Sequence, residues 1–278
     1  MFGNLKLHFL GTGGGRFTMV SQTRRTGGFR MIHGDTQIHI DPGPGALVFS
    51  NWADLNPRRL NAVIVTHCHP DHYGDAEVFI EAMSHGTEKR RGIIAAPRSV
   101  LNGSEICGPS ISSYHQKLVG DVKLLRKNSS FNVNDLKITA IEARHSDPDT
   151  IGLRIEVPDS GSIGYTSDTG YFPNLGKLYA DLRLLILCTM RPRKQPLEFH
   201  LSTDDALEII NFAKPKCAVL THFGMIMIKA NPESEARYLE SETGVPTIAA
   251  RDGIEIEISE SIRVSGPGKK YPPRTIEA

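Results

Sequence analysis

The chain has 278 residues, of which 39% are hydrophobic and 23% are charged. These fractions are typical of an ordinary globular protein and disfavour collagen-like, disordered and coiled-coil structures. Lys+Arg 32 against Asp+Glu 31 leaves a net charge of +1, so the bulk charge does not point to nucleic acid as a partner.

The cysteines and the apolar segments indicate the cellular compartment of the protein. Cys68, Cys107, Cys188 and Cys217 are scattered without CxxC spacing, which disfavours both a disulfide framework and a cysteine zinc site. No apolar stretch approaches the roughly 20 residues that a membrane helix requires, and the N-terminus lacks the features of a secretory signal. We therefore expect a cytoplasmic protein with reduced thiols and no membrane partner.

The first part of the chain is predicted to form short strands at 6–10, 29–32 and 37–40. A glycine-rich loop at 11–15 follows the first of them and superficially resembles a phosphate-binding loop. Residues 16–26 are polar, however, and do not open an apolar-periodic helix as such a loop requires. We expect a flexible loop beside a site.

An apolar, β-branched run at 62–65 is typical of a buried strand, and it leads directly into Thr66-His-Cys-His-Pro-Asp-His72. Apolar residues then recur at helical spacing, which predicts a helix that begins near Gly74 or Asp75. The positions concerned are Ala76, Phe79, Ile80 and Met83. The polar cluster therefore lies between a strand and a helix.

Strands are the main prediction for the remainder of the chain. The expected ranges are 93–96, 123–125, 137–141, 151–157, 162–166, 184–188 and 217–220. One helix is well defined, because Ser202 or Thr203 can cap it, an apolar stripe runs through 206–213, and Pro215 ends it.

No internal repeat or linker divides the chain, so residues 1–265 are predicted to form a single domain. Residues 266–278 are rich in proline, glycine and lysine. We expect them to form a loosely held extension, or else to brace a neighbouring subunit of a homodimer.

Three histidines and an aspartate share one loop, and packing alone rarely explains such a cluster. Imidazole nitrogens and carboxylate oxygens are ligands that suit zinc and similar divalent ions. His67 and His69, two residues apart on an extended segment, point to the same side and can hold one ion. Asp71 and His72 lie beyond the bend at Pro70 and would face a second position.

Further candidate ligands follow the ends of predicted strands, namely His145, Asp168 and His222. With the first cluster they give the order H-x-H-x-D-H, His, Asp, His, which resembles the metallo-β-lactamase fold superfamily. The matching stretches are Thr66–His72, Arg144–Ser146, Tyr165–Gly170 and Leu220–Gly224. The resemblance spans nearly the whole chain and implies an α/β (α+β) fold, a four-layer αββα sandwich with metals at one edge.

The resemblance also implies a ligand set for two divalent ions, zinc being expected and manganese or iron the alternatives. His67, His69 and His145 would bind one ion, and Asp71, His72 and His222 would bind the other. Asp168 would bridge them. The diiron, oxygen-reducing branch of the superfamily carries an acidic residue where His69 stands, which favours a hydrolytic centre.

His200 precedes the Leu201-Ser-Thr-Asp-Asp205 segment, an arrangement similar to the phosphodiesterase branch of the superfamily. That branch contains tRNase Z and the cyclic-phosphodiester hydrolase of bacterial phosphonate breakdown. The resemblance implies that a hydroxide bridging the two ions attacks a small or cyclic phosphodiester, and that His200 donates a proton or steadies the transition state. The residues expected to take part in catalysis are His200, Asp71 and Asp168.

Two other activities remain as alternatives. The first is tRNA 3′-end cleavage, which is disfavoured by the short interval between His145 and Asp168, where tRNase Z enzymes carry a long arm, and by the neutral charge. Local basic clusters lie at Lys89–Arg91, at Lys123 with Arg126–Lys127, and at Arg191–Lys194, and most such charge runs are solvated surface. We expect the Arg191–Lys194 loop to contact a phosphate, with Arg24–Arg25 as the weaker candidate. The second alternative is lactone or thioester hydrolysis on the same metal site; a non-enzymatic scaffold is disfavoured because every ligand position is filled.

Overall fold

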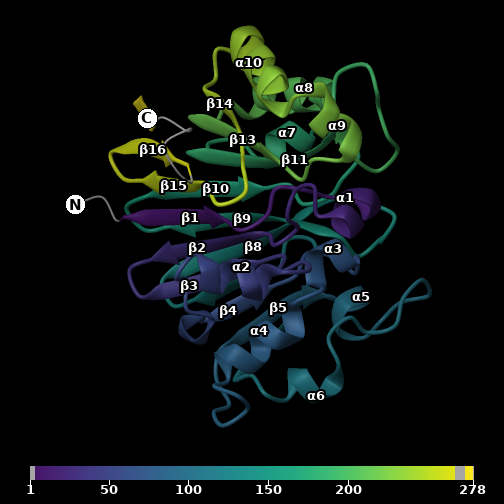
Figure 1. Ribbon diagram of the computed structural model, residues 1–278, viewed down its shortest axis with the longest axis vertical. Helices are drawn as coiled ribbons and strands as arrows, with labels where there is room; N and C mark the ends of the chain where they lie inside the picture. The colour runs from purple at the N-terminus through teal and green to yellow at the C-terminus, as the bar shows by residue number, and fades with distance from the viewer. Residues whose placement is uncertain (1–3, 267–272, 278) are drawn as a thin grey trace.

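The computed structural model describes residues 4–266 and 273–277, which form two β-sheets with helices outside them (Figure 1). The first sheet has the strand order β17-β16-β15-β1-β2-β3-β4-β5-β6. Its strands are β1 (Leu5–Phe9), β2 (Phe29–His33), β3 (Thr36–Ile40), β4 (Ala62–Ile64), β5 (Ile93–Pro97), β6 (Asp121–Leu125), β15 (Glu255–Ile258), β16 (Ser261–Ser265) and β17 (Arg274–Glu277).

The second sheet has the order β14-β13-β11-β10-β9-β8-β7, and β12 pairs with β11 outside this path. Its strands are β7 (Ser130–Val133), β8 (Leu136–Glu142), β9 (Ile151–Val157), β10 (Gly161–Tyr165), β11 (Leu184–Arg191), β12 (Leu201–Ser202), β13 (Cys217–Thr221) and β14 (Thr247–Ala249). β11 is buried along nearly its whole length, as expected for a central strand between parallel neighbours.

The helices are short and lie on the outer faces of the sheets. They are α1 (Arg16–Ser21), α2 (Ala46–Trp52), the 3-10 helix η1 (Pro57–Arg59), α3 (Pro70–Tyr73), α4 (Ala76–Met83), α5 (Arg98–Leu101), α6 (Ser113–Gln116), α7 (Leu175–Leu178), α8 (Thr203–Ala213), α9 (Met225–Ala230) and α10 (Pro232–Thr243). Among the described residues, no helix is long and apolar enough to cross a membrane.

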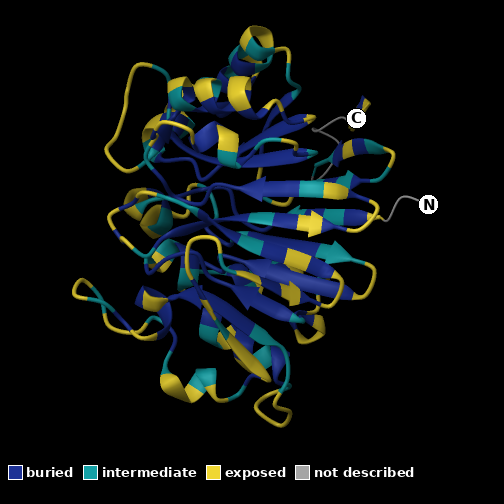
Figure 2. Ribbon diagram, turned by 180° about the vertical axis from the view of Figure 1, so that it is seen from behind, coloured by how far each residue is buried: buried dark blue, intermediate teal, exposed yellow. Residues whose placement is uncertain are grey.

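Three apolar clusters divide the molecule into four layers. The largest fills the space between the sheets and includes Phe9 and Ile38 from the first sheet and Ile155 and Ile186 from the second. A second cluster joins the outer face of the second sheet to α7, α8 and α10, and a third joins the first sheet to α2, α4 and α5. Figure 2 shows the strands as the most continuously buried part of the chain. The arrangement confirms the predicted αββα sandwich.

α8 begins as its sequence predicts. The Ser202 hydroxyl accepts a hydrogen bond from the Asp205 backbone N–H, and the Asp205 carboxylate accepts one from the Ser202 backbone N–H. This reciprocal capping box satisfies two backbone groups that the first turn would otherwise leave unpaired. The helix ends at Ala213, where Lys214 adopts a left-handed conformation before Pro215.

Three segments contradict a specific sequence expectation, and other elements, among them β7, β14, β15, β16, α2 and α10, were not predicted at all. Residues 16–26 contain the six-residue helix α1, and Asp71 and His72 lie on the single turn of α3. In the expected extension, Arg274–Glu277 form β17, which pairs antiparallel with β16 and buries Ile276 against Ile262. Residues 266–278 are dominated by proline, glycine and lysine, and this composition gives no signal for the four-residue strand near their end. Residues 267–272 and 278 lie outside the described part.

The strand directions bring the predicted site residues to one edge of the sandwich. Within the first sheet β1 runs parallel to β4, and within the second β8, β10, β11 and β13 share one direction. The C-terminal ends of β1, β4 and β13 lead into α1, α3 and α9, which lie near one another on one side in Figure 1. Loops from both sheets therefore converge there.

Candidate metal centre

The first group of predicted ligands comes together with its nitrogens facing one another. His67 Nε2 lies 3.0 Å from His69 Nδ1, and His145 Nε2 lies 3.0 Å from the same atom. His145 is fixed through its other nitrogen, since Nδ1 donates to the backbone oxygen of Phe199 at 2.9 Å. His67 and His69 come from the β4 end and His145 from the β8 end, so the two sheets share this group.

The second group forms in the same way. His72 Nε2 lies 3.0 Å from His222 Nε2, and Asp71 Oδ2 lies 3.3 Å from that His222 atom. α3 supplies Asp71 and His72 from the first sheet, and the end of β13 supplies His222 from the second.

Asp168 lies between the two groups. Its Oδ2 is 3.8 Å from His145 Nε2 and 3.7 Å from His72 Nε2, so one carboxylate reaches both sets. The structure thus brings all seven predicted ligands together, and each trio has its ligand atoms within 4.8 Å of one another.

The polar atoms of this cluster are better arranged to bind a cation than to hydrogen-bond with one another. The buried atoms Asp168 Oδ1 and His222 Nδ1 lie 3.2 Å apart, yet within residues 4–266 and 273–277 neither makes a hydrogen bond, although buried polar atoms are nearly always hydrogen-bonded. Burial lowers the pKa of His67 well below its ordinary value and that of His145 to about 4. Both imidazoles are therefore neutral near pH 7 and offer lone pairs, which is the form that ligates metals.

Asp41 is a site residue that the sequence reasoning missed. Its Oδ2 accepts hydrogen bonds from His72 Nδ1 at 2.9 Å and from the Tyr165 hydroxyl at 2.8 Å, and Thr66 donates to both carboxylate oxygens. Burial alone would lower the pKa of His72, but Asp41, with Asp168 and Asp71, raises it to about 10, so an ion bound by His72 would have to displace a proton from its imidazole. A carboxylate behind a metal-binding histidine fixes the ring and its tautomer.

The signal for Asp41 was present in the sequence. The residue directly follows the predicted strand at 37–40 and begins an Asp-Pro-Gly-Pro turn. That position matches the strand-end placement of Asp168 and His222.

The glycine loop is part of the site's framework. Gly15 N donates to Asp71 Oδ2 at 2.7 Å, and a Cβ at Gly14 would lie 2.2 Å from the His222 ring. Backbone hydrogen bonds join Gly14 and Thr12 to Phe223. The loop lies beside the site, as predicted, but these contacts tie it down where flexibility was expected. Only glycine at position 14 leaves room for the imidazole.

Asp147 supports the first group from behind and was also missed. Its Oδ2 accepts hydrogen bonds from the backbone N–H of Cys68 at 3.0 Å and from the Ser99 hydroxyl at 2.6 Å. It therefore holds the backbone between His67 and His69. Its proximity to His145 in sequence was the available signal.

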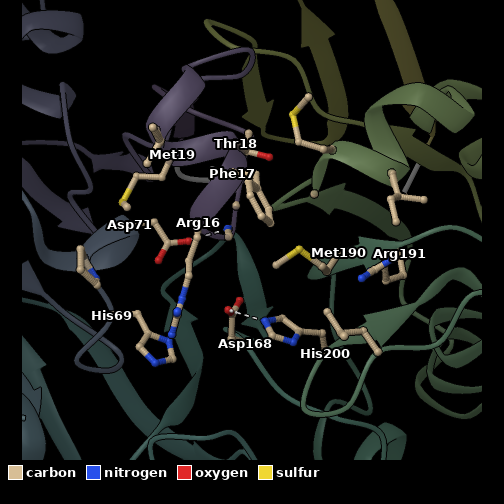
Figure 3. Close-up of a pocket in the computed structure, with 18 of the residues that line it drawn as sticks. Arg16, Phe17, Thr18, Met19, His69, Asp71, Asp168, Met190, Arg191 and His200 are labelled. Carbon is tan, nitrogen blue, oxygen red and sulfur yellow. Dashed lines mark hydrogen bonds and ion pairs between the residues drawn. The ribbon is translucent and has the colours of Figure 1, made fainter. Parts of the chain in front are cut away.

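His200 lies beside the shared aspartate and outside the two trios. Its Nδ1 donates to the backbone oxygen of Glu198 at 3.0 Å, which leaves Nε2 facing Asp168 Oδ2 at 3.5 Å (Figure 3). Burial lowers the pKa of His200, but the ion pair with Asp168 outweighs this and raises it above its ordinary value. One ring nitrogen of His200 is also within 4.8 Å of ligand atoms of His145 and Asp168, so the metal content of a His200 variant shows whether this residue is a ligand.

A pocket of about 790 Å³ opens onto the cluster, a size typical of small-molecule sites. His69, Asp71, Asp168 and His200 line its polar part, and α1 and α9 line its apolar part. Two arginines also line it, Arg16 of α1 and Arg191 at the end of β11. Within residues 4–266 and 273–277, neither guanidinium has an ion-pair partner.

Arg191 is the one residue of the predicted basic clusters that lines this pocket. Its neighbour Arg193 instead pairs with Glu235 at 3.1 Å and stacks on Tyr238. Arg24 and Arg25 pack over Phe223 and Phe49. Arg16 was not singled out from the sequence, because a lone arginine after a glycine loop carries no distinctive pattern.

Comparison with known proteins decides the family. A family model described as the beta-lactamase superfamily domain matches residues 36–223, a range that contains every predicted ligand. The chain belongs to this superfamily. The uncharacterized protein MJ1374 of Methanocaldococcus jannaschii is 38% identical over 256 residues, 91% of this chain and 95% of its own length. The UPF0173 metal-dependent hydrolase SSP1060 of Staphylococcus saprophyticus is 26% identical over 215 residues, 69% of this chain and 84% of its own length.

Solved structures of the superfamily share the fold. The metallo-beta-lactamase fold protein YhfI from Bacillus subtilis has a TM-score of 0.73 at 19% identity and covers 92% of this chain and 99% of its own. A diphosphatase of the PhnP family has a TM-score of 0.68 at 17% identity, with 92% and 98% coverage. Human tRNase Z, short form, has a TM-score of 0.66 at 19% identity, with 91% and 99% coverage.

Proposed function

We propose that the protein is a metal-dependent hydrolase that cleaves a small or cyclic phosphodiester with two divalent ions, zinc being the expected metal. The observation that carries the proposal is the position of His200, whose Nε2 faces the shared carboxylate of Asp168 at 3.5 Å from outside the two trios. Relatives named metal-dependent hydrolases support the general class. The PhnP-family diphosphatase, a structural neighbour, is consistent with phosphate chemistry.

Each residue of the pocket has a role in this reaction. His67, His69 and His145 would hold one ion, Asp71, His72 and His222 the other, and Asp168 both. Divalent ions at these positions supply the Lewis acidity that activates water and neutralises charge at phosphorus. Arg16 and Arg191 would bind the non-bridging phosphate oxygens, since guanidinium groups match that geometry.

His200 would act on the leaving group. Its Nδ1 proton is held by Glu198 O, so Nε2 is the nitrogen free to give a proton to the departing alkoxide oxygen. Asp168 orients that nitrogen toward the pocket. The thiolate released from a thioester would need no such proton, and the uncharged carbonyl of an ester or lactone would give the two unpaired arginines no anionic oxygen to bind in the ground state.

Turnover of competing substrates tests the proposal. The metal-loaded protein is assayed on bis(p-nitrophenyl) phosphate, a lactone and thioester panel, and precursor tRNA with a 3′ extension, before and after chelation. We expect the diester to be cleaved only with metal, and faster than lactone, thioester or tRNA. Preferred cleavage of a lactone or thioester, or a much higher kcat/KM for tRNA, contradicts the proposal.

Two arginine variants, one inside the pocket and one outside it, make the same assay more specific. Arg191→Ala should lower kcat/KM for the diester by roughly 10–100-fold, as expected for loss of a charge-assisted hydrogen bond. Arg126→Ala, in an exposed basic cluster outside the pocket, is the matched control and should match the unaltered protein. Equal losses in both variants would mean that general charge, and not the pocket, attracts the substrate.

A further inference from the structure

The pocket has a large apolar wall that the hydrolysis of a bare phosphodiester does not use. The wall is formed by α1, the end of β11 and α9, on the side where Phe17 and Met190 are drawn in Figure 3. Its apolar members are Phe17, Met19, Val20, Met190, Leu197, Met225 and Ile226. We call this set the apolar wall.

Two side chains of the apolar wall project almost fully into solvent. Phe17 is 82% exposed and Val20 is 80% exposed, and both belong to the six-residue helix α1. Exposed apolar surface that continues into a pocket is a common mark of a binding site. These side chains contribute little to the core, so burial within this chain does not account for them.

The apolar wall is held in place from behind. Thr18 Oγ1 donates to the backbone oxygen of Phe223 at 3.3 Å, which ties α1 to the segment preceding α9. Met190 is closely flanked, because a Cβ at Gly15 would lie 2.9 Å from its Cε and one at Gly224 would lie 2.6 Å from its Sδ. The two glycines therefore let this methionine fill the space between α1 and α9.

We propose that the substrate is a phosphodiester bearing an alkyl or acyl chain, with the phosphate at the metal cluster and the chain along the apolar wall. This inference rests on the proposed phosphodiesterase function. The apolar wall adjoins the candidate ligands Asp71 and Asp168 and the two unpaired arginines in one continuous pocket. An anionic group and an apolar group joined in one molecule would satisfy both parts at once.

The composition of the wall favours a flexible chain over a nucleobase. Three of its members are methionines and three are aliphatic, so Phe17 is its one aromatic ring. Methionine side chains are flexible and adapt to irregular apolar shapes. Recognition of a base would instead need convergent hydrogen-bonding groups and stacking faces.

A homologous series of substrates tests the inference. Methyl, butyl and octyl p-nitrophenyl phosphodiesters share one leaving group, so differences in kcat/KM report binding of the chain. Because each fully buried methylene contributes about 0.8 kcal/mol, partial burial predicts a rise of roughly 10–100-fold from methyl to octyl. Calorimetric binding of methyl, butyl and octyl phosphate monoesters should follow the same order without any turnover.

Two double variants test whether the apolar wall causes the dependence of kcat/KM on chain length. Phe17→Ser with Val20→Ser should reduce the octyl-to-methyl ratio of kcat/KM by at least about fivefold, because the chain loses its apolar contact. Val48→Ser with Val78→Ser removes exposed valines outside the pocket and should keep the ratio of the unaltered protein. Circular dichroism confirms that both variants fold.

Each outcome separates the inference from the proposed function. Hydrolysis of the methyl diester with no dependence on chain length would overturn the inference and leave the phosphodiesterase function intact. Absence of diester cleavage, with lactone cleavage instead, would overturn the function. If the Phe17 and Val20 variant dissociates a dimer in light scattering and keeps the chain-length ratio, the wall is a subunit interface and the inference is wrong.

Discussion

At the scale of single residues, the centre depends on groups that orient the candidate ligands as well as on the ligands. His72 is held by Asp41, His145 by the backbone oxygen of Phe199, and Asp71 by the backbone N–H of Gly15. Phe199 adopts a left-handed conformation with φ 63°, which non-glycine residues rarely do. Such backbone strain is tolerated where surrounding contacts hold the residue, and Phe199 is held by the hydrogen bond that its backbone oxygen accepts from His145.

His200 provides the most specific prediction at this scale. His200→Ala should leave the metal content unchanged and lower kcat by roughly 10²–10⁴-fold on an alkyl diester, because a positioned proton donor is lost. The loss should be smaller on bis(p-nitrophenyl) phosphate, since nitrophenolate departs without a proton. Parallel kinetics and elemental analysis measure both effects.

Two results would revise this role for His200. Equal losses on the two substrates would indicate that the imidazole positions the phosphate. Loss of a metal ion in the variant would make His200 a ligand, as its distance from His145 and Asp168 permits.

Asp41 is expected to act through His72. Asp41→Asn keeps the shape of the side chain but removes the charge that orients the imidazole, and should weaken metal binding by roughly 10–100-fold. Competition with a coloured chelator measures the affinity. Asp35→Asn, at a fully exposed aspartate, is the control and should bind metal normally. Unchanged affinity in the Asp41 variant would mean that His72 is oriented by packing alone.

The residues that the sequence could and could not reveal differ in a physical way. His67, His69, Asp71 and His72 stand within one short motif, so their chemistry is visible locally. Asp41 and Arg16 act across the fold as single polar residues, and the strand-end position of Asp41 is the one local signal that either of them has. Their roles arise only when strand ends from two sheets meet.

At the scale of elements, local signals fixed some boundaries closely. β9 coincides with its predicted range, and α8 starts at its predicted cap, because strand alternation and capping are encoded within a few residues. α1 and β17 are among the elements that were not predicted. Both are short, and each is stabilised by long-range contacts: α1 through Thr18 and Phe223, β17 through pairing with β16.

The α8 cap can be tested by stability. Ser202→Ala removes the hydroxyl that accepts from Asp205 N and should lower the free energy of unfolding by about 0.5–2 kcal/mol. Urea denaturation at an unchanged m-value measures this loss. Ser241→Ala, at an exposed serine inside α10, should shift the midpoint much less. Matching shifts in both variants would show that the capping box adds no specific stability.

At the scale of the whole molecule, the site exists because two sheets present their strand ends at one edge. The first sheet supplies His67, His69, Asp71 and His72, and the second supplies His145, Asp168 and His222. The order of these residues along the chain resembles the metallo-β-lactamase superfamily, and that resemblance predicted the sandwich. The pocket above these residues could not be predicted from the sequence, because α1 and α9 are far apart along the chain and become neighbours only in the folded protein.

The metal stoichiometry of the purified protein tests the central claim most directly. After reloading with zinc or manganese, elemental analysis should give two ions per chain. Asp168→Ala should lower the occupancy of both positions, because its carboxylate reaches His72 and His145 alike. A stoichiometry that stays at one or below after reloading would contradict the two-ion centre.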